Sequence, residues 1–394
     1  MKNFLKYHLL PLILGLFIAF FVAIILVKSP LLLRKNEKTK EVSTTKKLNP
    51  NSCLATLVEN EKQELELLAS LQEKQGITLF GSSELSVDSR FIPFTYLPEK
   101  KGIRVNAFGH AFQQNFAIYC QLLALKKSLK NAKVCIILSA SWFETEGTNM
   151  EAFLEFARPN FLKKIIRDQS ISLDVKNYIG EYLFKNSDKI ENSSQSINYF
   201  INLYKYKNIP FLNEYFFKKW KEFDKIAYKV NATYDKSVLA DAVEIDWDKE
   251  MEFIQKEFTS KIKSNKIFVN DEYFNQYLKQ EDGGFKKGNL LCLPKESNRE
   301  LEDFKLLVQL LKQEKCKASF VIQSMNPHYY NKLESFNPVL EEIKKLLEKE
   351  KLPYLNLFTA SKKKYEGGTL TDIMHFGDLG WLKVDEFLYK TYAK

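Results

Sequence analysis

The segment ITLFGSSE, residues 77–84, decides how this chain is expected to fold. Its first four residues, at 77–80, are mostly apolar or β-branched and predict a short buried strand. Gly81 then opens a tight turn that carries two serines, Ser82 and Ser83. In an open α/β sheet, a turn of this kind lies at the carboxyl edge of the strands, where ligands bind.

Similar apolar runs recur along the chain and alternate with stretches of helical periodicity. Further strands are expected at 104–108, 134–138, 319–322 and 354–358, and helices at 55–71, 116–125, 301–311, 339–347 and 381–388. Strands that alternate with helices predict a parallel sheet covered on both faces. The predicted fold class is therefore α/β, with a parallel sheet and helices on both faces.

Residues 150–290 interrupt this alternation. They are rich in Phe, Tyr, Lys and Asn and mostly helical in pattern, for example at 215–223 and 250–262. We expect an insertion that caps the carboxyl edge of the sheet. Two roles are open for its aromatic side chains, which either form a core of their own or lie against lipid headgroups.

An uncharged apolar run from Leu9 to Val27 predicts a membrane anchor. At about 1.5 Å per residue the run is roughly 28 Å long, which matches the hydrocarbon thickness of a bilayer. No small-residue cleavage site follows it, so we expect it to be retained. A buried core helix is the alternative. The predicted organisation is an anchor at 1–34, a polar linker at 35–54 and a catalytic domain at 55–394.

The chain has a formal net charge of +10, which favours an anionic partner. This partner could be nucleic acid, a membrane or an anionic polymer. No zinc finger, RNP motif or arginine-rich patch supports nucleic acid. The five cysteines include no C-x-x-C pair, so neither a metal site nor a disulfide framework is expected. No Walker A or G-x-G-x-x-G motif is present, and we expect no cofactor.

The run DIMH at residues 372–375 carries the expected chemistry, in a chain with only four histidines. Asp372 can hold the tautomer of His375 and stabilise its protonated form, so that His375 acts as general base. Ser83 is the expected nucleophile rather than Ser82, because it lies further past the strand and keeps its own N–H free for an oxyanion. The pattern predicts acyl transfer through a serine ester. A plain turn with capping serines is the alternative.

Three segments carry a resemblance to known proteins: Gly81-Ser82-Ser83-Glu84, Ser139-x-x-Trp142-Phe143, and Asp372-x-x-His375-Phe376-Gly377-x-x-Gly380-Trp381. With these segments the chain resembles the SGNH (GDSL-type) hydrolase superfamily and, within it, the DltD family of lipoteichoic acid D-alanylation. The resemblance implies Ser83 as nucleophile, His375 as base and Asp372 as the group that orients the base.

The resemblance also implies the groups that stabilise an oxyanion. They are the N–H of Ser83, the N–H of Gly109 and the side chain of Ser141. DltD-like proteins tend to have Gln in a Ser-Pro-Gln-Trp-Phe run, whereas this chain has the shorter Ser141 at that place.

The family further implies a location and partners. The catalytic domain would face outward on a Gram-positive cell membrane, attached by a single span. Its partners would be the membrane-bound O-acyltransferase DltB and the lipoteichoic acid polymer, with a D-alanyl carrier protein acting indirectly. Local charge favours the opposite orientation, because the basic run from Lys28 to Lys40 outweighs Lys2 and Lys6 under the positive-inside rule.

Two other functions are open at this stage. The same three residues would serve a membrane-tethered esterase or thioesterase that removes acyl groups, because water and a polymer hydroxyl are equivalent attackers of an ester. A non-catalytic binding or scaffold component of the D-alanylation machinery is the third possibility, and the short Ser141 side chain motivates it.

Overall fold

The computed structural model describes residues 61–144, 147–190, 194–209, 242–262 and 265–393. It also gives the backbone of two strands, β1 (Thr44–Leu48) and β5 (Val230–Tyr234), which pair in parallel. The predicted anchor at 9–27, most of the predicted linker and the predicted helix at 215–223 lie outside the described residues. No helix in the described part of the chain combines the length and apolar character that a membrane span requires.

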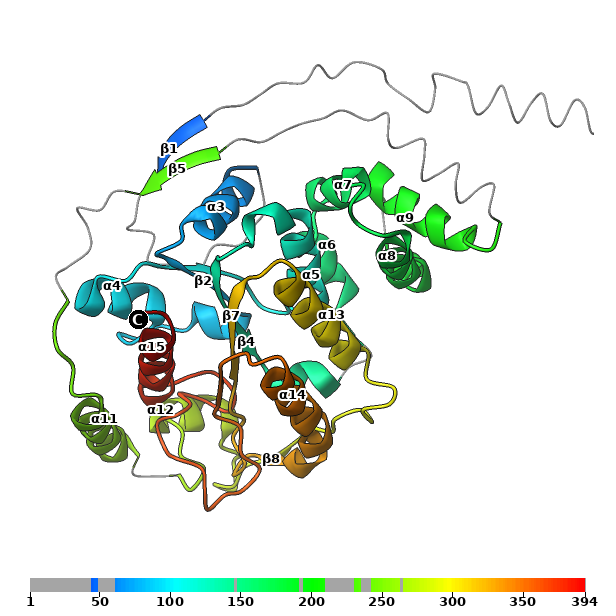
Figure 1. Ribbon diagram of the computed structural model, residues 1–394. Helices are drawn as coiled ribbons and strands as arrows, with labels where there is room; N and C mark the ends of the chain where they lie inside the picture. The colour runs from blue at the N-terminus through cyan, green and yellow to red at the C-terminus, as the bar shows by residue number, and fades with distance from the viewer. Residues whose placement is uncertain are drawn as a thin grey trace, which may run out of the picture. The chain divides into compact units, whose positions relative to one another are not determined.

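A five-stranded sheet forms the centre of the described part (Figure 1). Its strands are β2 (Ile77–Phe80), β3 (Val105–Phe108), β4 (Lys133–Leu138), β7 (Lys317–Ile322) and β9 (Tyr354–Asn356), in the order β3-β2-β4-β7-β9. Every neighbouring pair is parallel. The strand order reverses between β2 and β4, and such a switch point is where doubly wound sheets bind their ligands.

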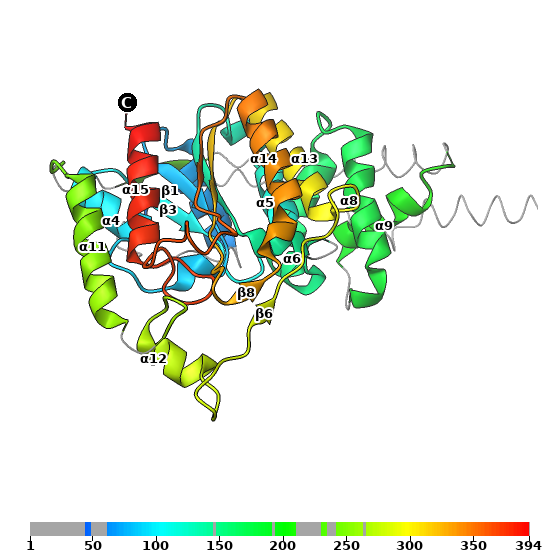
Figure 2. The same cartoon turned by 90° about the horizontal axis from the view of Figure 1, so that it is seen from below.

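Helices cover both faces of this sheet (Figure 2). One face carries α4 (Pro93–Lys101) and α15 (Asp378–Tyr392), with α11 (Trp247–Lys261) outside α15. The other face carries α3 (Glu61–Gln72), α5 (Asn115–Ala124), α13 (Arg299–Gln313) and α14 (Asn337–Lys349). The predicted α/β fold with a parallel sheet flanked by helices is confirmed.

The strands are apolar runs because both of their faces are buried. Ile77 and Leu79 of β2 are fully buried in the core beneath α4 and α15. Phe320 of β7 faces the other layer, where its ring packs edge-on against Phe304 of α13 at 5.5 Å between centroids. Alternate residues of each strand therefore serve opposite helical layers.

The segment between β4 and β7 is largely helical in the described residues. It contains α6 (Met150–Phe156), α7 (Pro159–Arg167), α8 (Leu173–Lys185), α9 (Gln195–Lys205), α11 and the short α12 (Asp271–Tyr273), which continues as a π-turn over Phe274–Leu278. The ring of Phe116 on α5 stacks on Phe153 and Tyr182, at 4.9 and 4.1 Å. These aromatic side chains form a core with α5. Of the two expected roles, a packed core or contact with lipid headgroups, these residues have the first. The domain boundaries at 55, 150 and 290 stay predictions.

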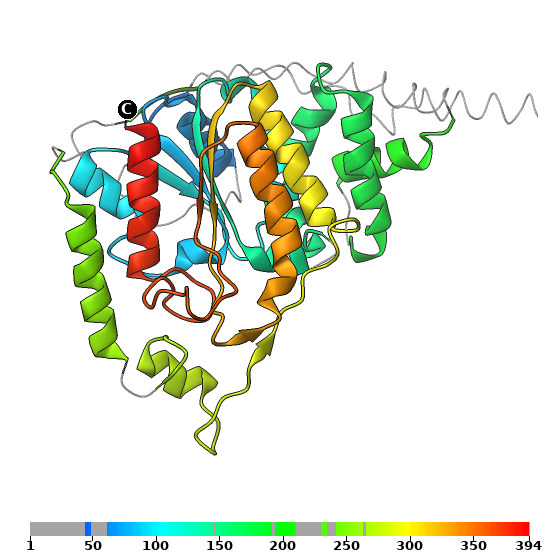
Figure 3. The same cartoon turned by 60° about the horizontal axis from the view of Figure 1, so that its bottom comes forward.

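Two short elements join this segment to the sheet region. Strand β6 (Gly288–Asn289) pairs in parallel with β8 (Tyr330–Asn331). They lie in the chain that leaves α12 and in the loop after β7, respectively, near the sheet edge where the loop before α15 also runs (Figure 3).

The last helix begins earlier than its pattern predicts, at Asp378 rather than at 381. Two close approaches explain this start. A Cβ at Gly380 would lie 2.2 Å from the Thr369 carbonyl oxygen, so only glycine lets the first turn of α15 pass this backbone. The fully buried rings of Phe376 and Trp381 then pack edge-on at 4.8 Å and anchor the helix to the core.

We predict that Trp381→Ala lowers the free energy of unfolding by about 3–5 kcal/mol, because the side chain is fully buried and leaves a cavity. Urea unfolding of the purified protein measures this change. Tyr277→Ala is the control, since Tyr277 is 65% exposed and should change stability by no more than about 0.5 kcal/mol. Equal effects of the two substitutions would contradict the core position of Trp381.

Candidate active site

Ser83 lies at the carboxyl end of β2, on the strand next to the switch point. It is the first residue of a 3-10 turn, η3 (Ser83–Ser86). The first N–H groups of such a turn have no partner within it, so the N–H of Ser83 is placed to donate outward. Gly81 precedes the turn and donates its N–H to the Phe108 carbonyl at 3.3 Å, which ties the turn to the end of β3.

His375 brings the distant end of the chain to this serine. Its Nε2 lies 3.0 Å from Ser83 Oγ, although the two residues are 292 positions apart. On the other side of the ring, Nδ1 lies 2.7 Å from Asp372 Oδ2. The structure therefore places the three residues predicted as a triad in one continuous hydrogen-bonded row.

Asp372 also builds the turn that presents the histidine. Its Oδ1 accepts the N–H groups of Met374 and His375, each at 2.7 Å. One carboxylate thus holds the backbone with one oxygen and the imidazole with the other. Such hydrogen bonds limit the orientations that the ring can adopt, so Nε2 stays directed at Ser83.

The surroundings of His375 favour its protonated form. Burial alone would lower the pKa of this imidazole, but the hydrogen bond and charge of Asp372, with a smaller contribution from the charge of Glu84, raise it above its ordinary value. A base whose protonated form is stabilised in this way suits removal of a proton from a serine hydroxyl.

Glu84 is a site residue for which sequence reasoning found no role. It is 1% exposed, and its Oε1 accepts the Ser82 N–H at 2.6 Å. A Cβ at Gly81 would lie 2.5 Å from this oxygen, so the glycine makes room for the carboxylate. Burial raises the pKa of Glu84 to about 7, against the hydrogen bonds from the backbone that favour ionisation. The sequence shows that Glu84 follows the Gly-Ser-Ser turn, but it does not predict that the Glu84 side chain is buried.

The expected oxyanion groups come to the same edge of the sheet. Ser141 lines the cavity that contains Ser83, with its Oγ 2.9 Å from Ser139 Oγ. Gly109 follows β3 at a φ of +146°, and a Cβ there would lie 2.1 Å from the Gly81 carbonyl oxygen. This close contact requires glycine and sets the distance between the ends of β2 and β3. The roles of Gly109 and Ser141 as donors stay predictions.

A cavity of about 1190 Å³ opens over the triad. The loops after β2 and β4 line it together with residues of the predicted insertion, among them Glu151 and Lys189. Gln323, which follows β7, also lines it, and its Nε2 donates to the Met374 carbonyl at 2.7 Å. Gln323 supports the turn from Asp372 to His375, and nothing in its sequence context signalled this role.

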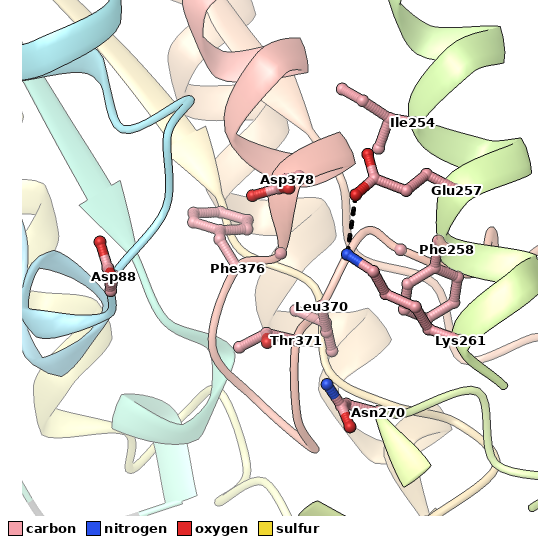
Figure 4. Close-up of a pocket in the computed structure, with 12 residues that line it drawn as sticks. Asp88, Ile254, Glu257, Phe258, Lys261, Asn270, Leu370, Thr371, Phe376 and Asp378 are labelled. Carbon is pink, nitrogen blue, oxygen red and sulfur yellow. Dashed lines mark hydrogen bonds and ion pairs between the residues drawn. The ribbon is translucent and has the colours of Figure 1, made fainter. Parts of the chain in front are cut away.

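A second, smaller cavity of about 210 Å³ lies between α11 and the loop before α15 (Figure 4). Two of the charged residues that line it, Glu257 and Lys261, form an ion pair at 2.8 Å, and Glu257 also binds Arg90 at 2.6 Å. Leu370, Thr371 and Phe376 line its wall, on either side of the turn from Asp372 to His375 in sequence. Phe258 of α11 contacts the same loop at Gly367, where a Cβ would lie 2.9 Å from its ring.

Metal chemistry has no visible ligand set in the part of the chain that the structure describes. Within those residues, no group of three or more His, Cys, Asp or Glu side chains is arranged to hold an ion. The reactive groups that line the large cavity are the Ser83 hydroxyl, the His375 imidazole and several carboxylates.

A serine, histidine and aspartate joined at the carboxyl edge of a doubly wound sheet is the arrangement of α/β serine hydrolases and acyltransferases. A comparison of the sequence with known families places the chain more narrowly. The family model described as "DltD protein" matches residues 56–393, and the chain belongs to this family. It is also similar to Protein DltD of Staphylococcus aureus (strain NCTC 8325 / PS 47), with 22% identity over 370 residues, covering 90% of this chain and 88% of that protein. Family membership links the chain to the D-alanylation of teichoic acids.

We predict that Glu84→Gln moves the acid limb of Ser83 reactivity to lower pH by less than about one pH unit, because a carboxyl group with a pKa of about 7 is only partly charged where His375 titrates. Glutamine keeps an acceptor for the Ser82 N–H but removes the charge that helps to raise the pKa of His375. Because the base acts when neutral, a lower pKa extends activity toward acid. The rate of labelling by a fluorophosphonate probe, measured against pH, tests this shift.

Glu151→Gln is the control for this experiment, because Glu151 lines the same cavity but is exposed. It should leave the acid limb in place. An unchanged limb in Glu84→Gln would show that the two groups are not electrostatically coupled.

Proposed function

We propose that this chain is a membrane-anchored, serine-dependent acyltransferase that attaches D-alanine to lipoteichoic acid at the outer face of the cell membrane. The observation that carries the proposal is the 3.0 Å contact between His375 Nε2 and Ser83 Oγ, which completes the row that starts at Asp372. Membership of the DltD family supports the choice of D-alanine and teichoic acid.

The mechanism follows from the order of these groups. Ser83 Oγ attacks the carbonyl carbon of a D-alanyl ester or thioester while His375 Nε2 takes the hydroxyl proton. The tetrahedral oxyanion receives hydrogen bonds from the Ser83 N–H, with Gly109 and Ser141 as the further donors that the family implies. Collapse breaks the bond to the leaving group, which takes the proton from His375, and leaves an alanyl ester on Ser83.

The second half of the reaction reverses these roles. A hydroxyl of the polymer gives its proton to His375 and attacks the alanyl ester on Ser83. Ser83 then leaves with the proton restored to its oxygen. Asp372 stabilises the imidazolium in both halves, since one of its oxygens stays hydrogen-bonded to Nδ1.

Three further parts of the proposal rest on the sequence and the family. The apolar run at 9–27 anchors the chain by a single span, and the catalytic domain faces outward. DltB, a membrane-bound O-acyltransferase, supplies D-alanine that originates from a carrier protein inside the cell. The net charge of +10 suits a polyanionic acceptor.

A tethered esterase is the second candidate function. One observation favours it, because the triad is fully assembled in this single chain and faces an open cavity of about 1190 Å³ that water can enter. The chemistry is the same up to the alanyl ester on Ser83, after which water replaces the polymer hydroxyl.

We predict that Ser83→Ala abolishes D-alanine esters on the cell-envelope polymer, a loss of at least about 10³-fold in transfer rate. Ester content of cells that express only the variant measures this. Ser82→Ala is the matched control, because Ser82 Oγ donates to the His110 carbonyl at 3.3 Å instead of facing His375, so it should retain the esters. Normal ester levels in Ser83→Ala would exclude the mechanism and favour a non-catalytic scaffold.

The orientation has a separate test. Protease added to intact cells without their wall should cut the catalytic domain if it faces outward. Complete protection, with cutting only after lysis, would support the orientation that the basic residues from Lys28 to Lys40 favour by the positive-inside rule.

A further inference from the structure

The large cavity differs in charge from the chain as a whole. The chain carries +10, yet the described residues that line the cavity include four carboxyl groups, Glu84, Glu144, Glu151 and Asp188, against two lysines, Lys185 and Lys189, and the imidazole of His375. One of these lysines, Lys185, is largely exposed and pairs with Glu181 at 2.7 Å, so its charge is screened. A cationic group on the substrate therefore finds a favourable field in this cavity.

Glu144 lines the cavity from the carboxyl end of β4. It ends the 3-10 turn η5 (Ala140–Glu144), which follows directly after β4 at the switch point. Side chains three residues apart on a 3-10 turn lie on the same face, separated by roughly 6 Å along the axis. Ser141 and Glu144 have this spacing, and both line the cavity with Ser83 and His375.

The environment of Glu144 holds its side chain in position. The Leu291 N–H donates to its carboxylate, and the residue is half-buried beside Cys292. Burial raises the pKa of Glu144, so the ionised form gains from a neighbouring cation. The other carboxylates fit less well: Glu84 is only 1% exposed beneath the serine turn, and Glu151 and Asp188 are exposed.

We propose that Glu144 binds the α-ammonium group of an aminoacyl substrate whose carbonyl carbon lies at Ser83. In such a group the ammonium is attached to the carbon next to the carbonyl. Ser141 can therefore donate to the carbonyl oxygen while Glu144 accepts from the ammonium of the same acyl group. This assignment rests on the proposed acyl transfer at Ser83. Under this assignment, Glu144 is the residue that makes the enzyme prefer aminoacyl esters to simple acyl esters.

The test compares two esters of one alcohol, the D-alanyl ester and the propionyl ester, which lacks the ammonium group. Full-length protein in detergent is assayed for kcat/KM on both. The wild type should prefer the alanyl ester, and Glu144→Gln should reduce this preference roughly 10- to 100-fold, because a charge-assisted hydrogen bond is lost. Glu155→Gln is the control, because Glu155 is an exposed carboxylate on the same helix α6 that does not line the cavity, and it should keep the preference.

The outcomes separate the two proposals. An unchanged alanyl-to-propionyl ratio in Glu144→Gln, with both esters cleaved, overturns the assignment and leaves the serine mechanism intact. An equal loss on both esters also overturns it, since that result describes a structural role. If the wild type cleaves neither ester and a fluorophosphonate probe fails to label Ser83, the acyl-transfer mechanism fails and the assignment of Glu144 fails with it.

Discussion

The geometry at Ser83 and His375 depends on the Asp372 carboxylate, which binds both the backbone of a turn and the histidine ring on that turn. Asp372 accepts two backbone N–H groups with one oxygen and the imidazole Nδ1 with the other. The first interaction shapes a tight turn, and the second orients the ring on that turn. Position and orientation of the base are therefore set by the same group, which leaves few alternative arrangements for His375.

The sheet then supplies the partner for this base. Parallel strands end at the same edge, so the turn after β2 and the turn after β4 meet there, while the chain after β9 returns to that edge before α15 begins. Backbone contacts too close for a side chain, at Gly109 against Gly81 and at Gly380 against Thr369, hold these loops at a fixed distance. Gln323 supports the histidine turn through its hydrogen bond to the Met374 carbonyl.

Charge is distributed unevenly between surface and site. A basic chain places acidic side chains around Ser83, and one of them, Glu84, is almost fully buried beside the serine turn. Burying a carboxylate is unfavourable unless it is hydrogen-bonded, and the Ser82 N–H supplies such a bond. The arrangement stabilises a protonated imidazole at one end of the cavity and suits a cationic substituent within it.

The amino-acid sequence by itself determined the α/β class, the buried strands and the identity of the serine, histidine and aspartate, because apolar periodicity and local spacing are properties of the chain. The spacing of Asp372 and His375 is of this kind, since three residues suffice for a turn. Only the tertiary structure decided that Ser83 lies within 3.0 Å of His375, that Glu84 turns inward and that Gln323 reaches Met374. The helix start at Asp378 is likewise a tertiary result, since it depends on Gly380 passing Thr369 and on Trp381 reaching the core. The contacts of Ser83 with His375 and of Gln323 with Met374 join residues that are remote in sequence. Their geometry depends on how strands and helices pack, which a local sequence pattern does not determine.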